Sequence, residues 1–398
     1  MDTETGGYSL SDEDVRLLAG LPRPFLHWYG EAARDLPWRR DRDPYRVWLS
    51  EIMLQQTRVE AVRGHFLRFI QVLPNIQALA EASQETVFKL WEGLGYYRRA
   101  RNLHSAAQRI MREREGIFPS AYQEILTLPG VGEYTAGAIA SICFDAHKPA
   151  VDGNVLRLMA RMLDSEAPID SSVFRRQVTA ALEGVLGSYV EPGAAGVFNQ
   201  SLIEAGAVVC LPKGALRCGA CPAVRFCKGV ASGRAEALPV RRVKKPRRIE
   251  EWTVLILWHG GGGYNLAGDS TGGMPAAPGA GASEARLALR RRGEHGLLSG
   301  MWELPNTQGW LSPHEALLFA ASLGAAPVAI EQVLDREHIF THVLWRMRGY
   351  VIRCAPIKKQ AGSQPAGIDH ALQWANAAQR EAAYPLPSAF RQFLTPNL

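Results

Sequence analysis

The spacing of hydrophobic residues divides the chain into two regions of different character. From Pro24 to about Gly206, apolar residues recur every three or four positions, and Gly or Pro residues separate the repeating segments. This period is typical of amphipathic helices joined by short turns, and segments 51–73 and 136–144 follow it closely. The first region is therefore predicted to be all-α.

The second region begins where the helical period ends, after Ala231. Residues 238–251 are rich in Pro and Arg and have no helical period, so they predict an exposed connector. Beyond this connector the pattern predicts strands and one helix, which makes the second region α+β. The strands are expected at 251–260, at 285–292 and around 340–353, and the helix at 313–324.

The chain is expected to form two domains and a linker. They are a helical domain over 1–229, whose last part ends at Cys227, a basic linker over 230–250 and an α+β domain over 251–398. Residues 260–283, rich in Gly, Ala and small polar residues, cannot bury enough apolar surface to order themselves. We expect a flexible hairpin insertion there. No Lys-Ser or Lys-Thr follows its glycines, which argues against a phosphate-binding loop.

Composition narrows the class of protein without identifying it. The 398 residues are 47% hydrophobic, 21% charged and 9% aromatic, which excludes collagen-like, wholly disordered and disulfide-scaffold classes. The longest apolar runs are far shorter than the ~18 to 20 residues that span a membrane. The acidic N-terminus does not resemble a secretory signal, so we expect a cytoplasmic protein without a membrane partner.

The net charge of +6 is unevenly distributed. Five of the six excess positive charges lie in the first 250 residues, and the densest basic run is 241–248. Such a run can follow a phosphate backbone, but a charge run is more often a solvated linker. Charge alone therefore does not establish binding to nucleic acid.

Four of the six cysteines lie within 18 residues. They are Cys210, Cys218, Cys221 and Cys227. A reducing compartment disfavours structural disulfides, so this cluster predicts a metal or iron–sulfur site. Four thiolates suit either Zn²⁺ or a [4Fe–4S] cluster, and ligand chemistry alone does not separate the two.

A glycine-containing turn, Leu-Pro-Gly-Val-Gly, lies between two predicted helices at residues 128–132. Gly130 and Gly132 permit a tight turn whose amides, with the N-terminus of the next helix, attract an anion. This pattern is typical of a helix–hairpin–helix, which holds a DNA phosphate without reading sequence. The five residues by themselves favour an ordinary turn between helices.

Two carboxylates are notable for their surroundings. Glu51 lies on an otherwise apolar helix face, where a carboxylate needs a partner or a function unless it faces solvent. Asp152, in Val-Asp-Gly-Asn-Val, precedes an apolar-periodic helix and is most simply its N-cap. From spacing alone, both residues have a structural explanation.

Five motifs occur in one order: WLSEIMLQQT, WEGLGYYRRARNLH, LPGVGEYTAGAI, VDGNVLRL and the four-cysteine segment. In this combination the chain resembles the helix–hairpin–helix DNA glycosylases with an iron–sulfur cluster, and among them the MutY-type adenine DNA glycosylases. The resemblance runs from about Asp35 to Cys227 and resumes at GLLSGMWELP and HIFTHVLW. It implies a DNA-associated monomer that removes adenine opposite 8-oxoguanine or guanine in duplex DNA, with one [4Fe–4S] cluster on the four cysteines.

The resemblance assigns opposite tasks to the two carboxylates. Breaking the bond between adenine and deoxyribose needs an acid at the base and a negative charge near an oxocarbenium-like sugar. Glu51 is thereby expected to protonate N7 of adenine and later to orient or deprotonate water, and its apolar helix face should raise its pKa. Asp152 is expected to stay ionised and to stabilise, or transiently bond to, the anomeric carbon. Tyr134 and Asn154 match residues that position these groups.

Further matched residues are expected to contact DNA. Gln56 and Tyr96 match residues that insert into the duplex beside the lesion, although Tyr96 by itself would suit a core aromatic. Leu128, Gly130 and Gly132 belong to the matched hairpin.

The C-terminal domain resembles the Nudix-like domain of this family. After GMWELP the chain lacks the glutamate cluster with which a Nudix hydrolase binds Mg²⁺, so recognition is the expected role. Phe340, Thr341 and His342 match the loop that contacts 8-oxoguanine, with Thr341 at a position where Ser is usual.

Three other functions agree less well with the sequence. An endonuclease III-like lyase acting on oxidised pyrimidines would carry a Lys where this chain has Tyr134, and a phenol cannot form a Schiff base. A non-catalytic, cluster-bearing DNA-binding protein would not need both Glu51 and Asp152. A Nudix hydrolase is the weakest alternative. We therefore expect a monofunctional glycosylase that uses water.

Overall fold

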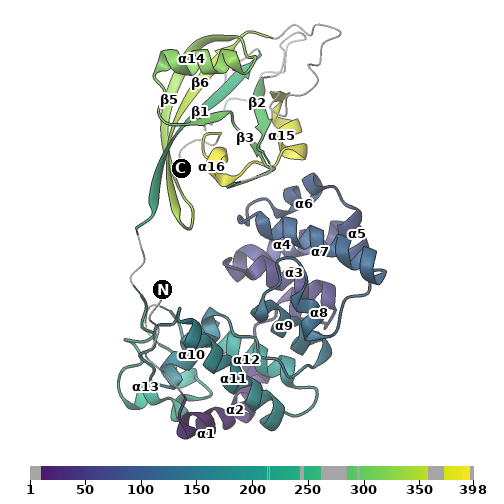
Figure 1. The fold of residues 1–398 in the computed structure, drawn as a ribbon, viewed down its shortest axis with the longest axis vertical. Coiled ribbons are helices and arrows are strands. Elements are labelled where there is room, and N and C mark those ends of the chain that lie inside the picture. The colour runs from purple at the N-terminus through teal and green to yellow at the C-terminus, as the bar shows by residue number, and fades with distance from the viewer. Residues whose placement is uncertain are drawn as a thin grey trace, which may run out of the picture. The chain divides into compact units, whose positions relative to one another are not determined.

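The computed structural model of the chain contains two compact units (Figure 1). The first consists of residues 1–82 and 101–244, and the second of residues 83–100 and 245–398. The insertion expected at 260–283 lies, except for Gly260, outside the described residues. The structure describes residues 10–212, 214, 216–242, 246–260, 285–293, 296–356 and 372–394.

The first unit is helical, as its apolar period predicts. Its helices begin earlier than expected, at Asp12 rather than near Pro24, because Ser11 and Asp14 form a capping box. No helix in the described parts of the chain is both long and apolar enough to span a membrane. The helices are α1 (Asp12–Ala19), α2 (Pro22–Ala32), η1 (Pro37–Arg39), α3 (Pro44–Leu54), α4 (Val59–Val72), α5 (Ile76–Glu81), α7 (Arg98–Arg114), α8 (Tyr122–Leu126), α9 (Glu133–Phe144), α10 (Gly153–Met162), α11 (Ser172–Tyr189), α12 (Ala195–Val208), η2 (Cys218–Ala220), η3 (Val224–Phe226) and α13 (Lys228–Ala231).

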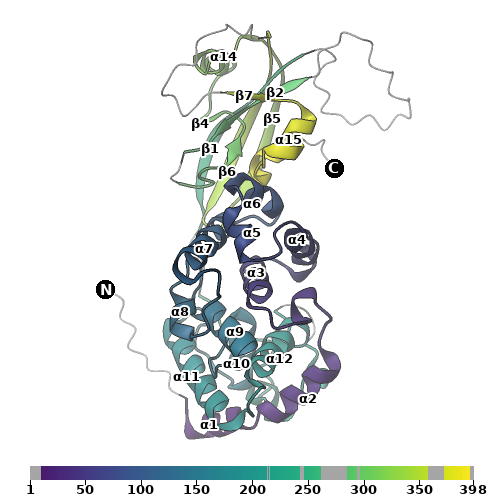
Figure 2. The same ribbon diagram turned by 90° about the vertical axis from the view of Figure 1, so that its right-hand side faces the viewer.

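Helix α10 is the most buried helix around the site described below. Its residues from Val155 to Met162 are all buried, and Figure 2 shows it beside α9, α11 and α12. Helix α12 approaches it closely, since a Cβ atom on Gly206 would lie 2.7 Å from the Cβ of Asn154. Only glycine permits this approach, which holds the first turn of α10 against α12.

The second unit is built on a mixed β-sheet with the strand order β3-β2-β1-β6-β5. Strands β1 and β6 run parallel from the pair Arg248 and Val343, and the remaining pairs are antiparallel. Strand β1 begins inside the stretch expected to be a linker. The elements are α6 (Gln84–Trp91), β1 (Arg248–His259), β2 (Arg286–Arg291), β3 (Trp302–Glu303), β4 (Asn306–Gln308), α14 (Pro313–Ser322), β5 (Pro327–Ile339), β6 (Val343–Cys354), β7 (Gln373–Ala375), α15 (Ala377–Ala383) and α16 (Ser388–Arg391).

Helices cover both faces of this sheet. Alternate residues of β1 point to opposite sides, with Val254 and Ile256 packed against α16, and Leu255 and Leu257 packed against α14. The α+β class predicted for this region is confirmed. Strand β5 was not expected: it lies entirely before the strands predicted around residues 340–353, and none of its side chains is buried, so its apolar pattern is weak.

Candidate active site

A cavity of 430 Å³ lies in the first unit among α3, α9, α10 and α12. All four residues with an expected catalytic task line it: Glu51, Tyr134, Asp152 and Asn154. They come from three different elements, so folding brings them together.

Glu51 lies on the cavity side of α3 with 8% of its surface exposed, which excludes a solvent-facing position. Its Oε2 atom accepts a hydrogen bond of 2.6 Å from the hydroxyl of Tyr134. Burial raises the pKa of Glu51 to about 7; the bond from Tyr134 opposes this shift, and the charge of Asp152 adds to it. A large fraction of this carboxyl group is therefore protonated near neutral pH.

Tyr134 is the second residue of α9 and follows the glycine turn directly. Burial, with the nearby carboxylates of Glu51 and Asp152, holds the pKa of Tyr134 well above 10. The phenol is thus a neutral hydrogen-bond donor at physiological pH.

Asp152 is both the N-cap of α10 and a wall of the cavity. Its Oδ1 atom accepts from the amides of Asn154 and Val155 at 2.8 Å each, and Oδ2 accepts from Nδ2 of Asn154 at 2.6 Å. Burial raises the pKa of Asp152, while these hydrogen bonds oppose the shift. The donors that begin the helix therefore also stabilise a negative charge facing the cavity.

Arg157 connects this site to the cysteine segment. Its Nη2 atom donates to Oδ1 of Asn154 at 2.9 Å and to the carbonyl of Gly206 at 2.7 Å, and its Nε atom donates to the carbonyl of Cys210 at 2.8 Å. Arg157 is buried. In the sequence, the only sign of this role is that an arginine occupies a position where the helical period predicts an apolar residue.

The cavity is also lined by two arginines, Arg34 and Arg39, that share one carboxylate. Glu204 is fully buried and accepts bonds of 2.6 and 2.8 Å from Arg34 and of 2.8 Å from Arg39. Burial alone would raise the pKa of Glu204, but these hydrogen bonds lower it to about 2. The resulting ion pairs hold both guanidinium groups in place beside the cavity.

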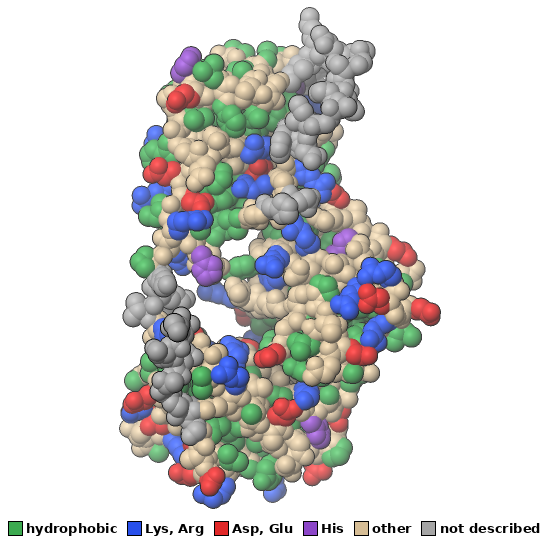
Figure 3. All heavy atoms as spheres, in the orientation of Figure 1, with side chains coloured by type: hydrophobic (Ala, Val, Ile, Leu, Met, Phe, Trp, Pro, Cys, Tyr) green, Lys and Arg blue, Asp and Glu red, His purple; other side chains and the backbone are tan. Residues whose placement is uncertain are grey.

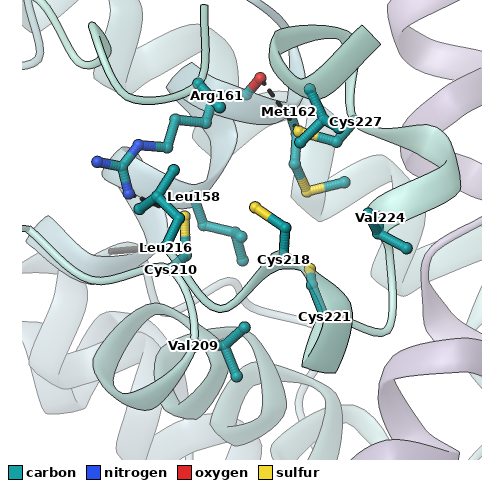
Figure 4. A pocket seen from close by; sticks show the side chains of 12 residues that line it. Leu158, Arg161, Met162, Val209, Cys210, Leu216, Cys218, Cys221, Val224 and Cys227 are labelled. Carbon is teal, nitrogen blue, oxygen red and sulfur yellow. Dashed lines mark hydrogen bonds between the residues drawn. The ribbon is translucent and has the colours of Figure 1, made fainter. Parts of the chain in front are cut away.

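The four clustered cysteines line a second pocket of the same unit (Figure 4). Their thiol groups surround one common space, and Nη1 of Arg161 donates to Sγ of Cys210 at 3.2 Å. In the described residues, no three Cys, His, Asp or Glu side chains are placed to hold a metal ion. The remaining walls are mostly apolar and include Leu158, Met162, Val209, Leu216, Val224, Val230 and Ala235.

Known proteins match both regions of the chain. Residues 49–180 match the HhH-GPD superfamily of base excision DNA repair proteins, and residues 280–395 match the NUDIX domain. The adenine DNA glycosylase of Mus musculus is 34% identical over 422 residues, which cover 96% of this chain and 79% of the mouse protein. The chain belongs to the adenine DNA glycosylase family.

Two more adenine DNA glycosylases are similar to this chain over most of its length. The Rattus norvegicus enzyme is 36% identical over 384 residues, covering 83% of this chain and 70% of the rat protein. The Homo sapiens enzyme is 34% identical over 373 residues, covering 83% and 66%. The family resemblance read from the five motifs is thereby confirmed.

Two residues of the glycosylase that are expected to enter DNA have an unusual backbone conformation. Gln56 has a φ of +58° and Tyr96 a φ of +48°, in the left-handed region that is costly for residues other than glycine. Gln56 lines the cavity, and half of the surface of Tyr96 is exposed, so Tyr96 is not a core aromatic. The guanidinium of Arg99 lies over the Tyr96 ring, 5.5 Å from its centroid.

The helix–hairpin–helix of the glycosylase consists of α8, residues 127–132 and α9. Gly130 has a φ of +79°, and a Cβ atom there would lie 2.7 Å from the Cβ of Asn102, so the turn requires glycine. Gly132 is the exposed N-cap residue of α9. The side chain of Leu128 is buried, so only its backbone is available to a phosphate.

The turn between β5 and β6 of the glycosylase exposes Thr341 and His342. The hydroxyl of Thr341 lies 3.2 Å from the hydroxyl of Tyr96, within the same unit. Thr341, expected to contact the base opposite adenine, and Tyr96, expected to insert into the duplex, are thus neighbours.

Charge density does not locate a DNA-binding surface on this glycosylase. On the face shown in Figure 3, Lys and Arg side chains are interspersed with acidic ones. Ion pairs account for much of this pattern in the sheet, where β5 and β6 exchange three of them. The pairs are Glu331 with Arg353, Asp335 with Arg348, and Glu337 with Arg346.

Proposed function

We propose that this enzyme hydrolyses the bond between adenine and deoxyribose where adenine is paired with 8-oxoguanine or guanine in duplex DNA. The observation that carries the proposal is one cavity that contains a buried, readily protonated carboxyl group and a second carboxylate held by a helix N-terminus. Its family membership supports adenine as the base.

Glu51 acts as the general acid. The neutral carboxyl donates its proton to N7 of adenine, which turns a poor leaving group into a neutral base, and the remaining carboxylate then orients or deprotonates water. Tyr134 keeps Glu51 in position through its 2.6 Å hydrogen bond. A positioned acid of this kind typically contributes about 10² to 10⁴ in rate.

Asp152 stabilises the positive charge that develops on the sugar. Its ionised form is favoured by three donors from Asn154 and Val155, which are already in place before the reaction and need no reorganisation. Asn154 is in turn held by Arg157. The carboxylate thus faces the anomeric carbon, or bonds to it transiently, until water attacks.

Water is the expected nucleophile because the site offers a phenol where a lyase would need an amine. Tyr134 follows the hairpin at the position of the lyase's lysine, and its raised pKa keeps it neutral. The product is an abasic site, and the phosphate backbone stays intact.

Adenine reaches the cavity only outside the base stack, and its extrusion costs a few kcal/mol. Gln56 lines the cavity with a left-handed backbone and is suited to fill the space that the base leaves. The hairpin amides at Gly130 and Gly132 are suited to hold a phosphate beside it.

The turn with Thr341 and His342 contacts the base opposite adenine. The second unit is assigned a recognition role, because the segment after GMWELP lacks the glutamate cluster with which a Nudix hydrolase binds Mg²⁺. We retain the domain limits predicted above, at residues 229 and 250, and a single chain as the active form.

Cys210, Cys218, Cys221 and Cys227 hold one [4Fe–4S] cluster. A Zn²⁺ ion draws its sulfurs to ~2.3 Å from one centre, whereas a four-iron cluster takes one thiolate at each iron. The four thiols share one largely apolar pocket, which suits a cluster bound by thiolates, and family membership favours the [4Fe–4S] cluster. When bound, the cluster would cross-link residues 210–227 and so stabilise this segment.

The test is single-turnover adenine release from three duplexes, with adenine opposite 8-oxoguanine, guanine or thymine, followed by alkali to reveal abasic sites. Release from the first two duplexes but not the third is expected. Borohydride should trap no covalent complex, and a strong adduct would favour a lyase. An intact cluster with no release from any duplex would reject the proposal.

A further inference from the structure

The β5–β6 turn rests on a group of side chains that no step above uses. Its backbone is closed by the amide of Phe340, which donates to the carbonyl of Val343 at 2.8 Å. The amide of Arg248, the first residue of β1, donates to the carbonyl of His342 at 3.1 Å. Backbone hydrogen bonds to β6 and from β1 therefore hold the turn in place.

The ring of Phe340 packs between two other rings. It meets Trp345 edge to face with 4.9 Å between centroids, and His338 lies 4.5 Å away on β5. Trp345 is 1% exposed and belongs to the core of the sheet. The position of Thr341, next in the chain after Phe340, therefore depends on where Trp345 is held.

One carboxylate holds Trp345. The Oε2 atom of Glu250 accepts from Nε1 of Trp345 at 2.8 Å and from Nε1 of Trp252 at 3.2 Å. The two indole rings are 4.7 Å apart, and the guanidinium of Arg292 lies within 5.6 Å of both centroids. Arg292 is itself anchored by the buried carboxylate of Glu303.

We propose that Trp345 and Glu250 are positioning residues for discrimination of the base opposite adenine. Glu250 fixes the Trp345 ring, this ring fixes Phe340, and Phe340 presents Thr341 and His342 to the opposing base. The inference rests on the proposed function, because it assumes that this turn contacts that base.

The test compares two tryptophans that donate to the same oxygen. Trp345→Phe removes the hydrogen bond to Glu250 from the ring that contacts Phe340. Trp252→Phe removes the hydrogen bond to Glu250 from the second indole, which packs against Trp345. The ratio of adenine release opposite 8-oxoguanine to release opposite guanine should fall about tenfold or more in Trp345→Phe, as expected for loss of a bond to a charged acceptor. It should change less than about twofold in Trp252→Phe, which leaves the Trp345 bond intact.

A second pair of variants addresses Glu250 and guards against misfolding. Glu250→Leu should lower the ratio as Trp345→Phe does, and Glu250→Gln, which keeps an acceptor oxygen, should recover most of it. The rate opposite guanine and the cluster absorbance should stay at wild-type values, which a general structural defect would not allow.

The outcomes separate the two proposals. A wild-type enzyme with no preference for 8-oxoguanine overturns the proposed function of the turn. A wild-type preference that survives in both Trp345→Phe and Glu250→Leu overturns the positioning role alone. Equal losses in Trp345→Phe and Trp252→Phe, or equal losses on both duplexes, also overturn it.

Discussion

The catalytic cavity and the β5–β6 turn use polar side chains in opposite ways. In the cavity, Glu51 is buried and Asp152 half-buried, and loss of water raises the pKa of both. At the turn, Thr341 is exposed, whereas the residues behind it, Glu250 and Trp345, lie mostly or fully inside the sheet domain.

The difference follows from what each place is proposed to do. An acid for adenine has to be protonated near pH 7, and removal from water gives a carboxyl group such a pKa. A residue that reads a base from outside has to reach it from the surface, so its accuracy depends on the rigidity of its support. Removal from water therefore sets the pKa of the acid in the cavity. Packing behind the turn sets how accurately the turn recognises the base.

The largest effect should come from replacing the carboxyl group of Glu51, which supplies the proton to adenine. Glu51→Gln keeps the size of the side chain and an acceptor for Tyr134 but donates no acidic proton, so single-turnover adenine release should fall about 10³-fold. Binding of the 8-oxoguanine duplex, measured by anisotropy, should be retained. Release at the wild-type rate would contradict the role of Glu51.

The same substitution should stabilise the fold at alkaline pH. The folded state raises the pKa of Glu51 from 4.5 to about 7, so wild-type stability falls as the pH rises between these values. The accumulated loss is about 3 kcal/mol above pH 7. In urea unfolding, Glu51→Gln should exceed the wild type by up to this amount at pH 8 and lose the advantage near pH 5. An equal gain at both pH values would exclude linkage to this carboxyl group.

Gly206 tests how tightly the cavity depends on helix packing. A Cβ atom there would meet Asn154 at 2.7 Å, so Gly206→Ala should destabilise the protein by about 2 kcal/mol and slow adenine release. Gly184→Ala on α11 is the matched control, since no described atom lies within 4 Å of its added Cβ. It should be neutral or stabilising by up to about 1 kcal/mol in the same melting experiment.

Tyr134→Phe should shift the pH profile of the reaction. The acid works in its protonated form, so the wild-type rate should fall as the pH rises through about 7. The hydrogen bond from Tyr134 lowers the pKa of Glu51, and its loss should move this fall to higher pH. A profile that moves to lower pH would show that Tyr134 does not stabilise the carboxylate.

The smallest effect is expected at the exposed turn. Thr341→Val removes the hydroxyl and keeps the shape, so the preference for 8-oxoguanine over guanine should fall about threefold to tenfold, the value of one hydrogen bond. Thr341→Ser keeps the hydroxyl and should stay near the wild type. Equal preference in all three proteins would indicate that the turn does not read the base through this hydroxyl.

Much of the fold could be predicted because helices and strands leave periodic patterns in local sequence. The helical region, strand β1 and helix α14 were found in this way. Strand β5 was missed because none of its side chains is buried, so its sequence carries only a weak apolar pattern. In the candidate site, the carboxylates and cysteines are recognisable by type and motif, whereas Arg157 is an ordinary arginine until its four acceptors are seen.

The sequence by itself determined which chemical groups are available: two carboxylates, a phenol in place of an amine, four clustered thiols and a glycine turn. Only the tertiary structure decided the protonation of Glu51, because a pKa depends on burial and on neighbours far away in the chain. The same holds for the ion pairs of Glu204 with Arg34 and for the bond from Trp345 to Glu250. These contacts join residues 170 and 95 positions apart, beyond the reach of any local pattern.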